Sequence, residues 1–294
     1  MSQGDAAVSV RHASVDPSSL DLLRQGITDI RSRTRLVRYL VTAEMKKRGS
    51  DTLLGNLWWI LDPLLQMVVY VLFVAIIGRG LTHPDYPLFI FAAILPWKWY
   101  SAVINDATTS VIRHDRLIRQ IAFPKLVLPV STTTAGVVGF AWGMVPLAGL
   151  ILLHQHRISL MLLWIPVIAV VQYVFTLASA ILVSAANVFF RDLGNAIGHA
   201  LRLWWFLSPG LYSLSGLQDI SIVKENPIIA QLAALNPFAV LFEAYRAAIY
   251  GTAAGEPLMP DIAGLAILLA ISLVFLAGTI IFFKRVEPDF AKIL

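Results

Sequence analysis

The sequence predicts an all-α integral membrane protein with six transmembrane helices. Of its 294 residues, 57% are hydrophobic and 14% are charged, whereas soluble domains carry about 25% charged residues. Several apolar runs are long enough for helices that cross a bilayer, which need about 20 residues. These runs do not alternate in polarity as the strands of a spanning β-barrel do. The chain contains no cysteine, so disulfides and thiolate metal sites are excluded.

Six stretches have the required length and apolar character, and we expect each of them to cross the membrane once. Arg202 and Pro209 interrupt the fifth, which is therefore the weakest. No cleavable signal peptide is expected, because residues 1–33 form a polar leader ahead of the first apolar run. Residues 53–294 are then one membrane domain. The six predicted spans are Leu53–Ile77, Pro87–Ile112, Leu126–Leu153, Leu160–Phe190, Gly194–Leu214 and Ile262–Phe283.

Lysines and arginines near the span ends predict the orientation. Thirteen of them fall on one side of the membrane and four on the other. Because loops rich in Lys and Arg stay in the cytoplasm, we expect a multi-pass protein of the cytoplasmic (inner) membrane with both termini in the cytoplasm. The thirteen are Arg35, Arg38, Lys46, Lys47, Arg48, Arg113, Arg116, Arg119, Lys125, Arg191, Lys284, Arg285 and Lys292, and the four are Arg79, Arg157, Lys224 and Arg246.

The external segment 215–261 contains an apolar piece, PIIAQLAALNPFAVLFEAYRAAIYG, which includes Glu243 and Arg246. Its charges and prolines make it a poor candidate for a simple span. We expect re-entrant helices that dip into the outer half of the membrane, where surrounding protein has to cover their backbone.

An amphipathic helix is predicted just before the first span, within residues 34–52. The stretch TRLVRYLVTAEMKK places apolar residues on one helical face and Arg35, Arg38 and Lys46 on the other. This pattern is typical of a helix that lies in the membrane interface. A positively charged anchor without any other role has the same pattern.

The loop 113–125 between the second and third spans, RHDRLIRQIAFPK, has a similar pattern. Leu117, Ile118 and Ile121 cluster on one side of a short helix that Pro124 stops. Such an apolar knob can lie on lipid or fit a groove on a cytoplasmic partner, and charge and periodicity leave both possibilities open. The basic residues around the knob are Arg113, Arg116 and Arg119.

No part of the sequence predicts catalysis. There is no GxxxxGK[ST] loop to hold nucleotide phosphates, so this chain is not expected to bind ATP in the usual way. His154 and His156 form an HxH pair without a third ligand nearby, which favours a structural or solvated pair over a metal site. Ser215 with His199 is too weak a pattern for a serine protease. We expect no nucleic-acid partner.

Seven motifs carry a resemblance to a known family. In this order along the chain, they resemble those of the permease subunits of type-2 ABC exporters, in the branch that exports O-antigen, teichoic acid and related polysaccharides. The resemblance runs from about Arg35 to Leu294 and departs at Lys98, where the family usually has an uncharged residue. The motifs are LLGNLWWILDPLLQMVVY, YPLFIFAAILPWKWYSA, RLIRQIAFPKLVLP, VFFRDLGN, LSPGLYSL, LNPFAVLFEAYRAAIYG and FKRVEPDFAKIL.

The resemblance implies partners and a substrate. The loop 113–125 is then a coupling helix in a groove of a separate cytoplasmic ATPase, which binds ATP and Mg, so no cofactor is expected in this chain. A homodimer with two ATPase copies is expected, and the substrate is a lipid-linked polysaccharide on an isoprenoid pyrophosphate. The alternatives are a small-molecule exporter and a membrane-embedded isoprenoid-sugar enzyme. We expect the anionic head of the substrate to meet Arg38, Lys46, Lys47 and Arg48.

Ionisable residues inside the spans predict a substrate pathway. Such groups usually face protein or water, which favours the pathway for Lys98, Asp106 and Arg202. The alternative for Lys98 is that it extends its ammonium group to the membrane surface.

Aromatic residues inside or beside the spans are a second sign of a pathway. Their ring faces suit the C–H groups of sugars, but aromatic residues also form belts at membrane interfaces. Both roles remain open for Tyr100, Trp142, Trp204 and Tyr212. Gly139 and Gly143 form a GxxxG pattern, which predicts close helix packing.

Overall fold

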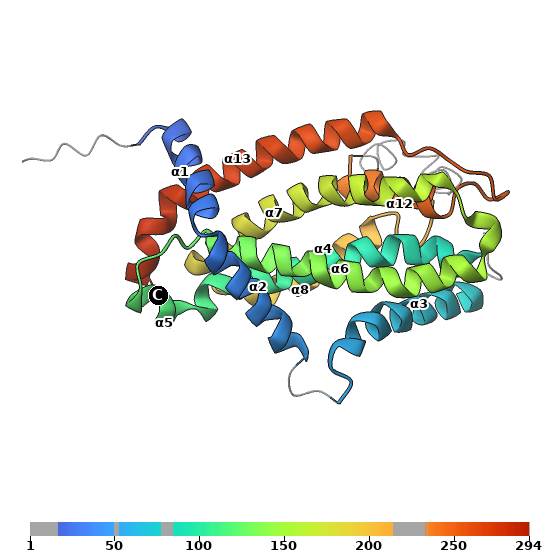
Figure 1. Ribbon diagram of the computed structural model, residues 1–294, viewed down its shortest axis with the longest axis horizontal. Coiled ribbons are helices and arrows are strands. Elements are labelled where there is room, and N and C mark those ends of the chain that lie inside the picture. Colours follow the sequence, from blue (N-terminus) through green and yellow to red (C-terminus); the bar gives the residue numbers. More distant parts are fainter. Residues whose placement is uncertain (1–16, 50–52, 78–84, 214–232, 234, 294) are drawn as a thin grey trace, which may run out of the picture.

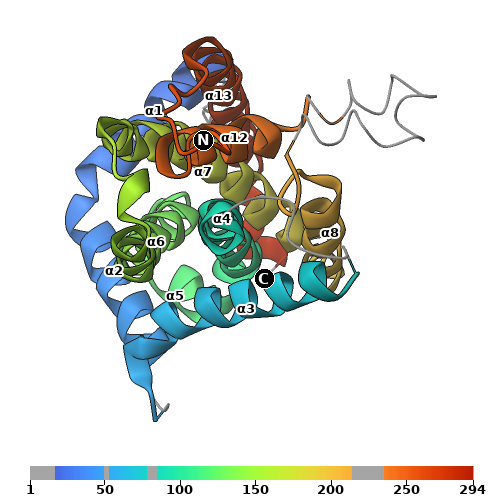
Figure 2. The same cartoon turned by 90° about the vertical axis from the view of Figure 1, so that its right-hand side faces the viewer.

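The computed structural model describes residues 17–49, 53–77, 85–213, 233 and 235–293. This part of the chain is helical and contains no strand. Five of its helices are long and apolar enough to cross a membrane, which confirms an all-α, multi-pass protein. Figures 1 and 2 show the helices packed side by side in one bundle. The predicted count of six spans is not reached by the described residues.

The five long helices lie where apolar spans were predicted. The start of the first is later than the predicted Leu53, because a 3-10 turn, η1 (Gly55–Leu57), precedes it. The last continues beyond the predicted end at Phe283. The five are α3 (Trp58–Ile77), α4 (Tyr86–Arg113), α6 (Val127–Leu153), α7 (Ile165–Phe189) and α13 (Ile262–Ile293).

Shorter elements complete the bundle. A 3-10 turn, η2 (Gln155–Arg157), follows α6, and another, η3 (Leu160–Trp164), leads into α7. The short helices are α1 (Ser19–Ser32), α2 (Thr34–Gly49), α5 (Asp115–Gln120), α8 (Leu193–Leu207) and α12 (Pro237–Ile249).

The predicted fifth span corresponds to α8, which is shorter than expected. It has 15 residues, or about 22 Å of helix, against a hydrocarbon core of about 30 Å. The helix ends because Pro209 disfavours the helical conformation at the preceding residue, and Ser208 is extended, with φ −95° and ψ 150°. Residues 214–232, which include the predicted end of this span, lie outside the described residues.

α4 forms the centre of the bundle, with α3, α6, α7, α8 and α12 around it (Figure 2). Hydrogen bonds between buried polar groups join helices in this core: Gln172 Nε2 of α7, for example, donates a 2.8 Å hydrogen bond to the carbonyl of Pro96 in α4. α6 approaches α4 closely through Gly136 and Gly143, where a Cβ atom would lie 2.2 Å from Val103 and Leu95 respectively. Of the two glycines in the predicted GxxxG pattern, Gly143 packs closely as expected. Gly139 does not, because a Cβ there would meet nothing within 4 Å.

A buried arginine ties the end of the bundle on the right in Figure 1 to the residue before α4. Arg157 is 5% exposed. Its Nε donates to Asp85 Oδ2 at 3.0 Å, its Nη1 donates to the carbonyl of Tyr250 at 2.8 Å, and its guanidinium lies 4.0 Å from the centre of the Tyr250 ring. His156 Nε2 also lies 2.8 Å from Asp85 Oδ2. The HxH pair thus shares a carboxylate with Arg157, and no cluster that could hold a metal occurs among the described residues.

A second buried arginine holds α12 against the segment after α8. Arg246 Nη2 donates to the carbonyl of Gly210 at 2.6 Å, and Nη1 donates to the carbonyl of Tyr212 at 2.9 Å and to Glu243 Oε1 at 3.2 Å. The guanidinium lies 4.0 Å from the centre of the Phe89 ring in α4. Two of the seven motifs, LSPGLYSL and LNPFAVLFEAYRAAIYG, therefore meet in space because one side chain binds both.

The leader 1–33, for which no structure was predicted, contains α1. Ser18 Oγ accepts a hydrogen bond from the backbone N–H of Asp21 at the start of this helix. Leu22 and Gly26, one turn apart, are buried, and α1 packs on α13. The short apolar face was overlooked because most of the leader is polar. α1, α5 and the C-terminus lie at the same end of the bundle, on the left in Figure 1. The distribution of Lys and Arg predicts that this end faces the cytoplasm, and it is named the inner end for that prediction.

A buried charge cluster holds this inner end together. Lys284 Nζ donates to Asp29 Oδ2 of α1 at 2.8 Å and to Glu287 Oε2 at 2.6 Å. The other oxygen of Glu287 accepts a 2.6 Å hydrogen bond from the backbone N–H of Lys125, just before α6. α13 continues beyond the predicted span end because these charges are paired and because Phe290 is fully buried.

We expect Lys284→Met to destabilise the protein strongly. The substitution leaves Asp29 and Glu287 without their cation, and breaking a buried ion pair costs about 3–5 kcal/mol. Lys292→Met is the matched control on the same helix, because the pair of Lys292 with Asp289 is solvent-exposed and such pairs contribute little. Thermal unfolding of the purified variants measures the difference. Equal midpoints for the two variants would show that the inner cluster does not stabilise the bundle.

Asp85 predicts a pH dependence of stability. Burial acts to raise the pKa of its carboxyl, but hydrogen bonds from His156 and Arg157 prevail and leave this pKa below its usual value. A carboxyl with a lowered pKa stabilises the fold above its unfolded pKa of about 3.9 and loses this contribution as the pH falls through the folded pKa. Asp85→Asn is therefore expected to unfold at lower temperature at pH 7, with a difference from wild type that shrinks below about pH 4.

The asparagine substitution isolates the charge at this position. Asp85 has a left-handed backbone, with φ 51° and ψ 38°, which asparagine also adopts readily. The unfolding midpoints of both proteins are compared between pH 3 and pH 7. A difference that does not change with pH would exclude the ionised carboxyl as its cause.

Candidate functional site

A groove of about 240 Å³ lies between α3, α4 and α6. Its lining combines aromatic rings, a charge of each sign and a glycine. Lys98 stands near the middle of α4 and Gly139 near the middle of α6, whereas the lining residues of α3 belong to its first two turns. The groove therefore lies at the start of the α3 span. The lining includes Trp58, Trp59, Asp62, Lys98, Trp99 and Gly139.

The groove contains an ion pair between Lys98 Nζ and Asp62 Oδ2, which joins α4 to α3. The side chains remain 30% and 57% exposed, respectively. Asp62 lies in the first two turns of α3, near the end of that span. Ionisable side chains within membrane segments usually face protein or water, and the partial exposure of this pair is consistent with such a position. Asp62 was missed by the sequence analysis, although it is the only charged residue between Leu53 and Ile77.

Aromatic rings flank the ion pair. Trp58 is 43% exposed, whereas Trp99 is 4% exposed and packs against Phe140 with 4.7 Å between ring centres. Open space lies beside Gly139, where a Cβ would meet no atom within 4 Å. The groove therefore offers ring faces, hydrogen-bond donors and hydrogen-bond acceptors within one small volume.

Two predicted pathway residues belong instead to a packed aromatic cluster, which corrects their assignment. Tyr100 is 3% exposed, so its ring has almost no surface for a ligand. Phe238 of α12 sits 4.7 Å from the Tyr100 ring and 5.4 Å from the Trp204 ring, both edge to face. Trp204 Nε1 also donates to Asn236 Oδ1 at 3.2 Å. These contacts are typical of core packing.

The other predicted pathway residues, apart from Lys98, do not line the groove. Trp142 is 40% exposed on α6, and Arg202 is exposed on α8, where its Nε donates to the carbonyl of Gly198 at 3.3 Å. The carbonyl of Asp106 accepts a hydrogen bond from Arg113, and the carbonyl of Tyr212 accepts one from Arg246. Among the seven predicted pathway residues, Lys98 alone lines the groove.

The predicted coupling loop forms α5 at the inner end, but its apolar residues separate. Ile118 is 7% exposed and packs in the protein's own core, with Leu117 half-buried against the same core. Ile121 is 55% exposed. The predicted single knob is wrong because α5 ends at Gln120 and Ile121 is extended, with φ −132° and ψ 130°. The exposed surface here includes Ile121 with Arg113, Arg116 and Arg119.

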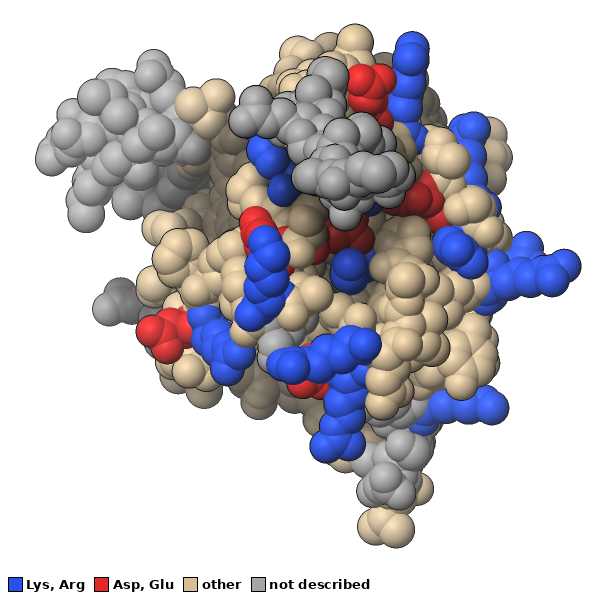
Figure 3. Space-filling view, turned by 90° about the vertical axis from the view of Figure 1, so that its left-hand side faces the viewer, with Lys and Arg blue, Asp and Glu red and all other residues tan. Residues whose placement is uncertain are grey.

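Basic side chains gather on this inner end of the molecule, which Figure 3 shows from the left of Figure 1. α2 contributes Arg38 and Lys46, both exposed. The side chains of Lys47 and Arg48 lie outside the described residues. The apolar face of α2 packs on the bundle through Leu40, which is 7% exposed, so this part of the predicted interface helix contacts protein.

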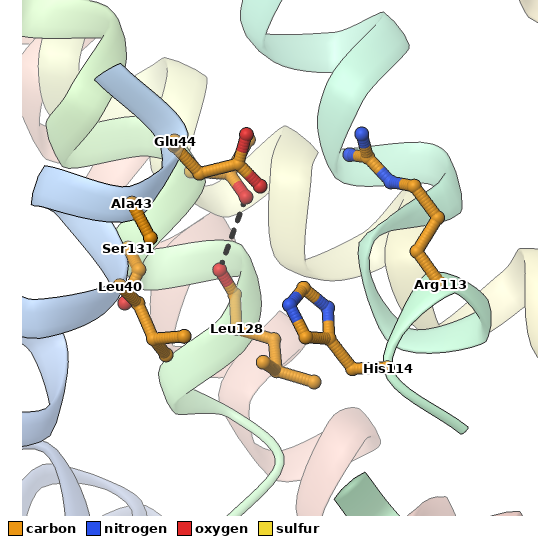
Figure 4. A pocket seen from close by; sticks show the side chains of 8 residues that line it. Leu40, Ala43, Glu44, Arg113, His114, Leu128 and Ser131 are labelled. Carbon is orange, nitrogen blue, oxygen red and sulfur yellow. Dashed lines mark hydrogen bonds between the residues drawn. The ribbon is translucent and has the colours of Figure 1, made fainter. Parts of the chain in front are cut away.

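A second cavity, of about 160 Å³, lies where α2 meets the ends of α4 and α6. Figure 4 shows Glu44 on one side of it and Arg113 and His114 on the other. The dashed line marks the 3.2 Å hydrogen bond from Thr132 Oγ1 to the carbonyl of Leu128. Neither Arg38 nor Lys46 lines this cavity, and the carboxylate of Glu44 disfavours an anion there.

Single substitutions of the groove ion pair should lower the amount of folded protein. Lys98→Met leaves Asp62 as an unpaired charge, and Asp62→Leu leaves Lys98 unpaired. Each costs less than the about 2.5–3.5 kcal/mol of a charge at the bilayer centre, because Asp62 lies near the end of its span. The double variant removes both charges and is expected to recover the wild-type amount. Fluorescence-detected size exclusion of solubilised membranes measures folded protein. If the double variant gave as little folded protein as either single variant, the result would contradict the pairing of Lys98 with Asp62.

Comparison with curated proteins relates most of the chain to known permeases. The chain is 32% identical, over 253 residues, to the O-antigen export system permease protein RfbA of Myxococcus xanthus; this covers 86% of the chain and 93% of that relative. It is 28% identical, over 200 residues, to the O-antigen export system permease protein RfbA of Klebsiella pneumoniae, covering 67% of the chain and 77% of that relative. No protein-family model matches the chain. The extent of the first match shows that the chain belongs to the O-antigen export permeases, within the type-2 ABC permeases that its motifs predicted.

Proposed function

We propose that this chain is the membrane permease subunit of an ABC exporter that moves a lipid-linked polysaccharide, O-antigen-like or teichoic-acid-like, across the cytoplasmic membrane. The observation that carries this proposal is the match over 93% of the Myxococcus xanthus permease. Five long apolar helices and a groove with exposed charges at the start of the α3 span support it.

The energy comes from a separate ATPase that binds ATP and Mg, because the sequence contains no phosphate-binding loop. The surface for this partner is the exposed part of α5 and its flanks, with Ile121 as the apolar contact and Arg116 and Arg119 around it. Two permease chains form a homodimer with two ATPase copies, since closed two-fold symmetry is the commonest arrangement. The enzyme activity then belongs to the partner.

The basic end of the bundle faces the cytoplasm. α1 and the C-terminus lie at that same end (Figure 1), which favours an even number of crossings. We therefore keep six crossings of the inner membrane, with α8 contributing to the fifth. α12 is too short to span, with 13 residues, and enters from the outer side under the cover of α4, α7 and α13.

The pyrophosphate head of the substrate is expected to approach the basic face of α2. Arg38 and Lys46 are exposed there, and Lys47 and Arg48 follow in the sequence. Arginine and lysine bind phosphate oxygens through charge-assisted hydrogen bonds.

Deletion of the gene tests the proposed function. We expect glycan to disappear from the cell surface and lipid-linked glycan to accumulate inside the cell, and a plasmid copy of the gene to restore export. Unchanged surface glycan in the deletion strain would refute the proposed function.

Ile121→Asp should separate coupling from folding. Because Ile121 is exposed, the permease should keep its unfolding temperature but lose binding to the ATPase in a pull-down of purified subunits. Ile118→Asp should destabilise the permease itself by several kcal/mol, because it buries a charge.

Ile158→Asp is the control for the pull-down. Ile158 is 53% exposed but follows η2 at the other end of the bundle, so its substitution should leave ATPase binding intact. Normal binding by Ile121→Asp would show that α5 does not form the contact.

A further inference from the structure

We propose that the groove between α3, α4 and α6 seats one sugar ring of the transported polymer, with Trp58 and Trp59 against the ring and the Asp62–Lys98 pair bound to its hydroxyl groups. This inference rests on the proposed function and names a contact site for its substrate. The groove brings together aromatic rings, a hydrogen-bond donor and a hydrogen-bond acceptor. Of the predicted pathway residues, Lys98 is the one that lines it.

The ion pair makes the groove a polar site. Asp62 is 57% exposed and Lys98 30% exposed, near the start of α3 and near the middle of α4, respectively. Ionisable side chains within membrane segments usually face water or protein. A polar ligand can therefore reach them, whereas an acyl chain would have to cover both charges without hydrogen bonding to either.

The chemistry of the lining fits a carbohydrate better than an anion. The Asp62 carboxylate accepts hydrogen bonds and the Lys98 ammonium donates them, and a sugar hydroxyl can do both. An anionic group would be repelled by Asp62 at the position where Lys98 attracts it. The aromatic rings beside the pair offer electron-rich faces to the C–H face of a sugar. Such contacts do not depend on one exact orientation, which suits a chain that has to slide.

The size of the groove limits the ligand to a single ring. Sites that enclose drug-sized ligands have volumes of about 300–1,000 Å³, and this groove has about 240 Å³. One ring of the polymer can occupy it while the rest of the chain lies outside. A contact of this size holds the polymer weakly, as transport requires.

The absence of cysteine from the chain allows a clean test. Gly139→Cys introduces a single thiol in the groove, and Gly149→Cys introduces one on the same helix outside it. A Cβ at either position meets nothing within 4 Å, so both variants should fold. Ala102→Cys on α4, which also lines the groove, is a second reporter if Gly139→Cys is scarce.

Each thiol is labelled with benzophenone maleimide in membranes that contain the permease, its ATPase and lipid-linked polysaccharide, and the membranes are then irradiated. We expect the label at residue 139 to form adducts that stain for glycan after periodate oxidation, and the label at residue 149 to form none. Adducts at residue 139 with lipid alone, with a second permease chain or with nothing would overturn the inference. Glycan adducts at both positions would overturn it as well.

Filling the groove gives an independent readout. Gly139→Leu should lower surface glycan per folded permease severalfold, whereas Gly149→Leu should leave it unchanged. Normal export by both variants would refute the groove as a sugar site. The proposed function would still stand if gene deletion abolished export, so the two failures are distinguishable.

Discussion

The hydrocarbon core of the membrane provides no water for polar groups, and this constraint determines how every charge in the bundle is placed. Arg157 and Arg246 are buried, and each has several hydrogen-bond acceptors and an aromatic ring beside it. Lys284 is buried with two carboxylates. The pair of Lys98 with Asp62 differs because it is partly exposed, near the start of α3. Paired buried charges hold the two ends of the bundle, and the exposed pair makes the groove a polar site.

Hydropathy predicted the long helices well, because a span needs a fixed length of apolar chain whatever it packs against. It failed for α8 and α1. Pro209 ends α8 early through a local backbone preference that a hydropathy average does not detect. α1 buries only a narrow apolar face on α13, and its polar residues conceal that face from a search for apolar runs.

The site could be predicted only in part, because the sequence indicates the depth of a residue but not the direction of its side chain. Lys98 was identified because a charged side chain within a span is energetically costly and usually faces protein or water. Tyr100 was misassigned because the sequence does not distinguish a ring that packs against Phe238 from a ring that faces a channel. The coupling loop was misread at Ile121, where helical periodicity was assumed beyond the last helical residue, Gln120. Asp62 gave the same signal as Lys98, and their pairing became visible only when α3 and α4 were seen side by side.

The central claim is that this permease moves polysaccharide only when a second protein supplies the energy. Transport into proteoliposomes tests it most directly. Purified permease and its ATPase are reconstituted together, lipid-linked polysaccharide with a fluorescent label is placed in the outer leaflet, and ATP is added outside. We expect label to become protected inside the vesicles only when both proteins and hydrolysable ATP are present. Protection with permease alone, or with an ATP analogue that cannot be hydrolysed, would contradict the claim.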